Sequence, residues 1–172
     1  MRTLLRLIGF LAGTAWLAMA PAALAETSVY ANGGAYFTAS GPSAYWRYDS
    51  GQGYCGQFGT WCSPANSQWT WSTSTYGGVN NAVWNVIPID RYSRAYAFIP
   101  RRNATTRGAK YTVAYNWVSR RSSEIDQMRY YDQWVPLAFG DQLRRIHSVD
   151  LTDSTFEATA TRVNFDEIKI EN

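Results

Sequence analysis

The stretch that decides the fold is AKYTVAYNW, residues 109–117, in which large apolar side chains alternate with smaller or polar ones. In an extended chain Tyr111, Val113 and Tyr115 fall on one side, and the residues between them fall on the other. Such alternation is typical of a strand that has one face against a core. Residues 109–117 therefore predict a β-strand in a half-buried sheet.

Other short runs of Val, Ile, Thr, Tyr, Trp and Phe surround this strand, separated by clusters of Gly, Pro, Asn, Asp and Ser. After residue 25 helical patterns are nearly absent, so the chain is predicted to be all-β. An early short strand carries Trp69 and Trp71 on one face. The later strands are expected at residues 81–86, 94–99, 109–117, 129–139, 146–151 and 162–170. Their number and spacing predict a jelly-roll-like β-sandwich of about eight strands.

The N-terminus has the pattern of a secretory signal. Arg2 and Arg6 precede an almost uncharged run that ends at Ala23-Leu24-Ala25, the kind of small-residue site that a signal peptidase cleaves. Glycine and proline interrupt the apolar run, which favours a cleaved signal over a stable membrane anchor. Residues 1–25 are therefore expected to be removed, which predicts a secreted or periplasmic protein, with periplasm and external medium left open.

The part that follows the signal has the size of one domain. It is expected to comprise an irregular β/loop region at residues 26–66 and a β-sandwich at residues 67–172. Loss of Arg2 and Arg6 leaves 14 basic and 13 acidic residues, so the formal charge falls from +3 to +1. This balance gives no electrostatic footprint for nucleic acid.

Cys55 and Cys62 are the two cysteines of the sequence and lie in a segment rich in glycine. In an exported chain a closely spaced pair is most simply a disulfide that closes a small loop. A redox or zinc site is the alternative, but the spacing is not C-x-x-C and no nearby histidine or second cysteine pair completes such a site. A Cys55 to Cys62 disulfide is the prediction.

From about Ser67 onward the order of the motifs resembles the golvesin C-terminal domain, also described as the xanthan-lyase carbohydrate-binding-like domain. The resemblance rests on an ordered set of short motifs, each weak alone: Ala82-Val83-Trp84, Tyr96 to Pro100, Asn103 to Thr106 with Ala109 to Val113, Gln133 to Leu137 with Phe139-Gly140, Val149 to Asp153, and Phe165 to Ile168. It implies a β-sandwich that accompanies extracellular enzymes acting on polysaccharides or cell walls.

Aromatic residues are the strongest indication of function, since seven tryptophans and twelve tyrosines follow residue 25. Sugars stack on exposed aromatic rings while polar neighbours bind their hydroxyls. Trp84 and Trp134 occupy strand positions of the family and are expected to pack structurally. The binding candidates lie in irregular stretches: Trp46, Trp61, Trp117, Tyr130 and Tyr131. We therefore expect a non-catalytic domain that binds an extracellular polysaccharide or cell-wall glycan, of unknown oligomeric state.

The polar residues favour structure over catalysis. His147 lies inside an expected strand and has no serine or cysteine in a nucleophile setting, so no enzyme activity is predicted. Asp166 is in phase with Ile168 and Ile170 and is expected to be a buried, hydrogen-bonded structural acid, with Arg162, Arg94 or a backbone N–H as partner. A structural calcium shared with Asp150 or Asp153 is the weaker alternative, and no other cofactor is expected.

Two other functions remain open from the sequence. One is a surface or matrix protein whose sandwich contacts other proteins, for example by edge-strand pairing. The other is a small polysaccharide hydrolase that uses paired acids, such as Asp150 with Asp153 or Glu124 with Asp126. Turn formation and surface charge account for these acids more simply.

Overall fold

The computed structural model describes residues 26–54, 66–89, 92–116, 119–141 and 143–172. The expected signal segment, Cys55 and Cys62 lie outside these residues. Within the described ranges the chain forms strands, turns and short 3-10 helices. None of these helices is long and apolar enough to cross a membrane.

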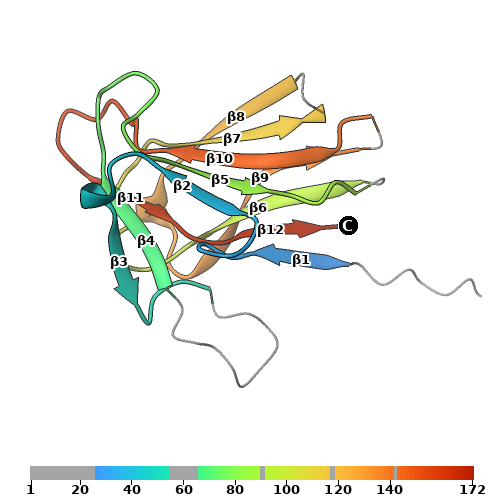
Figure 1. Ribbon diagram of the computed structural model, residues 1–172, viewed down its shortest axis with the longest axis horizontal. Coiled ribbons are helices and arrows are strands. Elements are labelled where there is room, and N and C mark those ends of the chain that lie inside the picture. Colours follow the sequence, from blue (N-terminus) through green and yellow to red (C-terminus); the bar gives the residue numbers. More distant parts are fainter. Residues whose placement is uncertain (1–25, 55–65, 90–91, 117–118, 142) are drawn as a thin grey trace, which may run out of the picture.

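Two antiparallel sheets form the layers of a sandwich (Figure 1). The first has the order β2-β5-β10-β7-β8, with β2 at Phe37–Ser40, β5 at Asn81–Asn85, β10 at Ile146–Thr152, β7 at Ala109–Tyr115 and β8 at Ser119–Ile125. The second has the order β1-β12-β6-β9, with β1 at Thr27–Tyr30, β12 at Ile168–Glu171, β6 at Ser93–Ile99 and β9 at Gln133–Gly140. This arrangement confirms the predicted all-β sandwich.

A smaller sheet closes one end of the sandwich, at the left of Figure 1. Its order is β11-β4-β3, with β11 at Arg162–Phe165, β4 at Asn66–Trp71 and β3 at Arg47–Ser50. The 3-10 helix η1, Ser43–Tyr45, leads directly into β3. We call this three-stranded unit the end sheet.

The segment that was expected to be least regular, residues 26–66, contributes one strand to each sheet. β1 pairs with β12, β2 pairs with β5, and β3 pairs with β4. These early strands contain few large apolar residues. Their place in the fold is set by backbone pairing with later strands, which a local pattern cannot show.

The core lies between the two large sheets. Tyr111, Val113 and Tyr115 point into it, as their alternation predicts, and Trp84 is completely buried beside the Phe37 ring, 5.2 Å away. Trp84 thus has the packing role expected of it. Its burial, together with that of the aliphatic residues of β10 and β12, gives the sandwich its hydrophobic stabilisation.

Three strand predictions need correction. Residues 119–125, where no strand was expected, form the edge strand β8, because their backbone pairs with β7 although their side chains are mostly polar. The strand expected at residues 129–139 begins only at Gln133, after the 3-10 helix η3 at Gln127–Arg129 and a positive φ of 54° at Asp132. The strand expected at residues 162–170 is two strands that belong to different sheets.

Candidate functional site

Two tryptophans, the half-buried Trp69 and the exposed Trp71, form an aromatic corner on the end sheet. Trp69 and Trp71 are two residues apart on β4, so both side chains leave the same face of the strand. Their ring centres are 5.6 Å apart and the rings are nearly perpendicular, at 86°. Edge-to-face packing of this kind holds each indole in a defined orientation.

Arg162 joins the two indoles from the neighbouring strand β11, where it pairs with Trp71. Its guanidinium carbon lies 5.2 Å from the centre of the Trp69 ring and 5.1 Å from that of the Trp71 ring. Cation–π attraction therefore adds to the edge-to-face contact. We call Trp69, Trp71 and Arg162 the indole platform.

A hydrogen-bonded relay fixes the arginine of the platform. Arg162 Nη1 donates to Asn103 Oδ1 at 2.7 Å, and Asn103 Nδ2 donates to the carboxylate of Asp49 on β3. Asn103 itself adopts a positive φ of 55°, a conformation that asparagine tolerates better than most residues. The relay spans the end sheet from β11 to β3, so the platform is organised before any ligand arrives.

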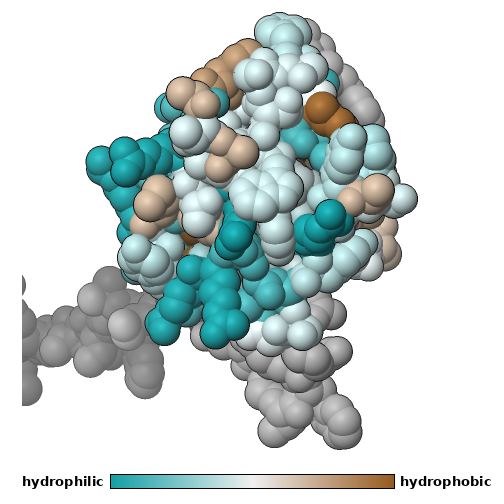
Figure 2. Space-filling model, turned by 90° about the vertical axis from the view of Figure 1, so that its left-hand side faces the viewer, coloured by the Kyte–Doolittle hydropathy of each residue, from teal (hydrophilic) through white to brown (hydrophobic). Residues whose placement is uncertain are grey.

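A hollow of about 250 Å³ adjoins the platform. Trp71 forms one wall with 48% of its surface exposed, and Tyr45 forms another with 54% exposed. The remaining lining is mostly polar: Arg47, Ser72, Thr73, Val79, Asn80 and Asp153. Figure 2 looks onto this end of the molecule, where pale side chains of intermediate hydropathy are bordered by strongly hydrophilic ones. The hollow is smaller than a typical drug-sized pocket of ~300–1,000 Å³, so it suits one unit of a chain.

Asp153 holds the floor of this hollow and is only 1% exposed. Its carboxylate accepts three N–H bonds, from Val79 N at 2.8 Å, Asn80 N at 3.0 Å and Asn80 Nδ2 at 2.9 Å. The turn that supplies these donors contains Gly78 at a φ of +79°, and a Cβ at this glycine would collide with the Thr152 hydroxyl. Glycine is therefore required for the turn to reach the acid.

Asp150 and Asp153, the acids considered for a shared calcium ion, do not face a common site. Asp153 uses both oxygens for N–H donors, whereas Asp150 points to the outer face of the five-stranded sheet. Among the described residues no group of three His, Cys, Asp or Glu side chains could hold a metal ion. The two acids are close in sequence, but they leave opposite sides of the chain at the end of β10.

The binding candidates that the structure describes do not form one exposed surface. Trp46, expected on the surface, is only 7% exposed and packs 4.8 Å from the Phe165 ring, so it belongs to the core. Tyr130 is half-buried against the core, while Tyr131 is 57% exposed. Trp61 and Trp117 lie outside the described residues.

Trp134 packs on the outer face of the four-stranded sheet, and not in the core between the sheets. It lies 4.7 Å from the Tyr54 ring and 5.3 Å from the Phe98 ring, with the Lys169 ammonium 5.0 Å above it. Its role is still packing, because three neighbouring side chains cover it. The difference arises because β9 presents Trp134 opposite Phe98, which faces outward.

The platform was missed as a site, although the sequence contained part of the signal. The spacing of Trp69 and Trp71 already placed both rings on one face of a strand. Nothing in the sequence showed that this face is the outer one, or that Arg162, some 90 positions later, would pair beside them. The strand order of the end sheet supplies both facts.

Asp166 is buried as expected, but for another reason than strand phase. It lies with Glu167 at the break between β11 and β12 and is 2% exposed. Its Oδ1 accepts the N–H of Glu167 at 3.0 Å, and Glu167 Oε2 accepts the N–H of Tyr54 at 3.1 Å. Burial, followed by the neighbouring Glu167 carboxyl, raises the pKa of Asp166 well above its usual value.

The arginine partners considered for Asp166 lie elsewhere. Arg162 belongs to the indole platform, and the Arg94 guanidinium lies 5.4 Å from the Phe139 ring. A backbone N–H, the third option, is the partner that the structure shows. Asp166 Oδ2 has no hydrogen-bond partner in the described part of the chain, so Asp166 carries a free-energy cost whenever it is charged.

His147 sits at a β-bulge. The register between β10 and β7 shifts between Ile146 and Ser148, so Ile146 turns into the core and His147 is displaced from the apolar face. It is half-buried and lines a small hollow on the outer face of the five-stranded sheet. Regular strand alternation would put His147 on the same face as Val149 and Leu151, and the bulge prevents this.

Comparisons with known proteins bear on the fold. No family model matches the chain, and the comparison with curated proteins found no match either. Among solved structures the chain is similar to a Paenibacillus xanthan lyase, with a TM-score of 0.58 and 16% identity over 84% of this chain. The match covers 13% of the lyase chain, so it concerns one region of that enzyme.

This likeness shows the fold alone: a β-sandwich of a kind that also occurs within a polysaccharide lyase. It agrees with the xanthan-lyase part of the family resemblance at the level of architecture. No family match supports the golvesin assignment, which stays a prediction.

Proposed function

We propose that this protein is a non-catalytic domain, secreted or periplasmic, that binds an extracellular polysaccharide through the indole platform. The observation that carries the proposal is the half-exposed Trp71 ring, held in place by Trp69 and Arg162 at the edge of a hollow of about 250 Å³. A sugar ring has an apolar C–H face and a rim of hydroxyls. An exposed indole suits the first and polar side chains suit the second.

Preorganisation supports the same proposal. The relay through Asn103 fixes the arginine beside the Trp71 wall, and the three N–H bonds to Asp153 hold the floor of the hollow. A ligand therefore meets side chains whose freedom is already restricted, which lowers the entropic cost of binding. The similar region in a xanthan lyase makes xanthan a reasonable first ligand to test.

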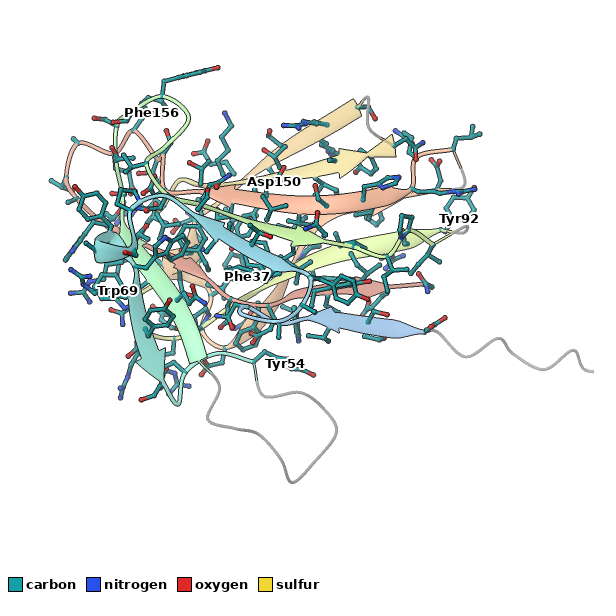
Figure 3. The ribbon with its side chains drawn as sticks, viewed as in Figure 1. Phe37, Tyr54, Trp69, Tyr92, Asp150 and Phe156 are labelled. Carbon is teal, nitrogen blue, oxygen red and sulfur yellow. The ribbon has the colours of Figure 1, made fainter. Side chains whose placement is uncertain are left out.

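Replacement of Trp71 by alanine is expected to weaken polysaccharide binding at least about tenfold, or ~1.4 kcal/mol, because the stacking surface is lost. The measurement is isothermal titration with xanthan oligosaccharides and with cellohexaose, a neutral chain. Tyr92→Ala is the matched control, since Tyr92 is an exposed aromatic residue at the opposite end of the molecule from Trp69 (Figure 3).

The outcome separates this proposal from its rivals. Undiminished binding by Trp71→Ala would show that the platform is not the site. If neither oligosaccharide binds the wild-type protein and the protein self-associates as its concentration rises, the structural or matrix function is favoured. Release of reducing ends from xanthan, lost on Asp150→Asn, would instead favour the hydrolase.

A further inference from the structure

The outer face of the five-stranded sheet is mostly polar. Strand alternation directs Asn81 of β5, Thr112 of β7 and Asp150 of β10 away from the core. Side chains of the same small or polar kind accompany them: Thr38, Ser40, Asn85, Ala114, Ser122, Ser148 and Thr152. The paired strands therefore present both hydrogen-bond donors and acceptors at regular positions on this face.

Two hollows lie side by side on this face and share one residue, Arg120 of the edge strand β8. The larger, about 320 Å³, is lined by Asn81, Val83, Thr112, Asp150 and Thr152, among others. The smaller, about 140 Å³, is lined by Asn85, Ala114, Ser119, His147 and Ser148. Arg120 pairs with Ala114 of β7 and lines both hollows together with residues of β10.

The central acid of the face is Asp150, and its hydrogen bonding is incomplete. It is half-buried, and its hydrogen bond from the Ser148 hydroxyl is long, at 3.5 Å. Burial raises the pKa of Asp150, and the positive charge of Arg120 partly opposes this effect. Outside its backbone pairing with β7, the Arg120 guanidinium forms no hydrogen bond or ion pair with any residue that the structure describes.

The Asp150 carboxylate and the Arg120 guanidinium line one hollow without a hydrogen bond between them. They can therefore bind a ligand that carries both hydrogen-bond donors and acceptors. A carboxylate accepts from hydroxyl groups, and a guanidinium donates to hydroxyl oxygens. Neighbouring hydroxyls of a sugar ring supply both donors and acceptors. A simple anion would meet repulsion from Asp150, and an apolar ligand would leave both groups unpaired.

We propose that this outer face is a second sugar-binding site, in which Asp150 and Arg120 bind adjacent hydroxyls of one ring. For the class of ligand the proposal rests on the proposed function, but its residues are separate from the indole platform. Adjacent residues connect the two sites: Asn80 and Asp153 line the platform hollow, and Asn81 and Thr152 line the outer one. Figure 3 shows Asp150 on β10, away from Trp69.

The test is an amide-resolved NMR titration of the full chain with the same two probes, xanthan oligosaccharides and cellohexaose. Wild-type protein and Trp71→Ala are both expected to show shifts at Thr112, Asp150 and Thr152. Asp150→Asn and Arg120→Gln are each expected to weaken the affinity measured from these shifts about tenfold, which is the effect of losing one hydrogen bond to a charged group. Glu124→Gln, on the same face but outside both hollows, is the matched control and should change it less than about twofold.

Each result decides the proposal. Shifts at the outer face that survive Trp71→Ala and weaken in both site variants support it. Shifts confined to residues around Trp71 would overturn it and leave the proposed function standing. An unchanged outer-face response in Asp150→Asn and Arg120→Gln would overturn it as well. Absence of any shift with either probe would overturn both proposals.

Discussion

Asp153→Ala is expected to lower the free energy of unfolding by about 3–4 kcal/mol, the largest effect of any single polar substitution that the structure suggests. The buried carboxylate satisfies the N–H groups of Val79 and Asn80 and the Asn80 amide. Alanine would leave these donors without an acceptor in a site that is almost closed to solvent. Urea denaturation followed by tryptophan fluorescence measures the change.

The matched control is Asp150→Ala, three positions earlier on the outer face of β10. It removes an acid of the same kind whose hydrogen bond from the Ser148 hydroxyl is long, at 3.5 Å, so a change within about 0.5 kcal/mol is expected. Asp153→Asn, which keeps one acceptor oxygen, should fall between the two. A loss of less than about 1 kcal/mol in Asp153→Ala would show that the turn does not depend on this acid.

The same substitution should also reach the proposed ligand site. Val79, Asn80 and Asp153 line the hollow beside Trp71, so loss of the carboxylate loosens its floor. Weaker sugar binding by folded Asp153→Ala is therefore expected even though the acid is buried beneath the surface.

Asp166→Asn is expected to remove part of the pH dependence of stability. The pKa of Asp166 is raised in the folded protein by burial and by the Glu167 carboxyl. Above about pH 4 the unfolded chain has released this proton while the folded chain still holds it. The contribution of Asp166 is therefore fully present below the unfolded pKa and is lost as the pH rises through the folded pKa, by up to about 1.4 kcal/mol for each pH unit of that window.

Unfolding free energies of wild-type protein and Asp166→Asn across pH 4 to 9 measure this effect. The difference between the two should grow in favour of the variant as the pH rises, and then level off. Taking the difference removes the opposite contribution of Glu157, whose pKa is lowered by hydrogen bonds from Thr106 and Thr161 against the effect of its burial. Glu124→Gln is the exposed control. Parallel profiles for wild type and Asp166→Asn would contradict the assignment.

Gly53 explains how tightly this acid is enclosed. It has a φ of +108°, and a Cβ there would lie 2.8 Å from Asp166 Oδ2. The next residue, Tyr54, donates its N–H to Glu167 and packs its ring against Phe98 and Trp134. The two acids thus lie under a backbone segment that leaves no space for a larger residue.

Much of the sandwich was predictable because side-chain direction in a strand has a period of two. The inward set of β7, the burial of Trp84 and the shared face of Trp69 and Trp71 all follow from this local rule. The edge strand β8 could not be predicted in this way, because its sequence, SRRSSEI, has no apolar face. Its backbone is extended only because it pairs with β7.

The sequence by itself determined the fold class and the supply of aromatic residues, since both depend on composition and local alternation. Tertiary structure alone decided which of those residues are available to a ligand. Trp46 is buried because Phe165 comes to lie against it, and Trp71 is exposed because the end sheet turns its outer face to solvent. Arg162, Asn103 and Asp153 join the site through contacts between distant strands, and pairing between distant strands is not encoded in any local pattern.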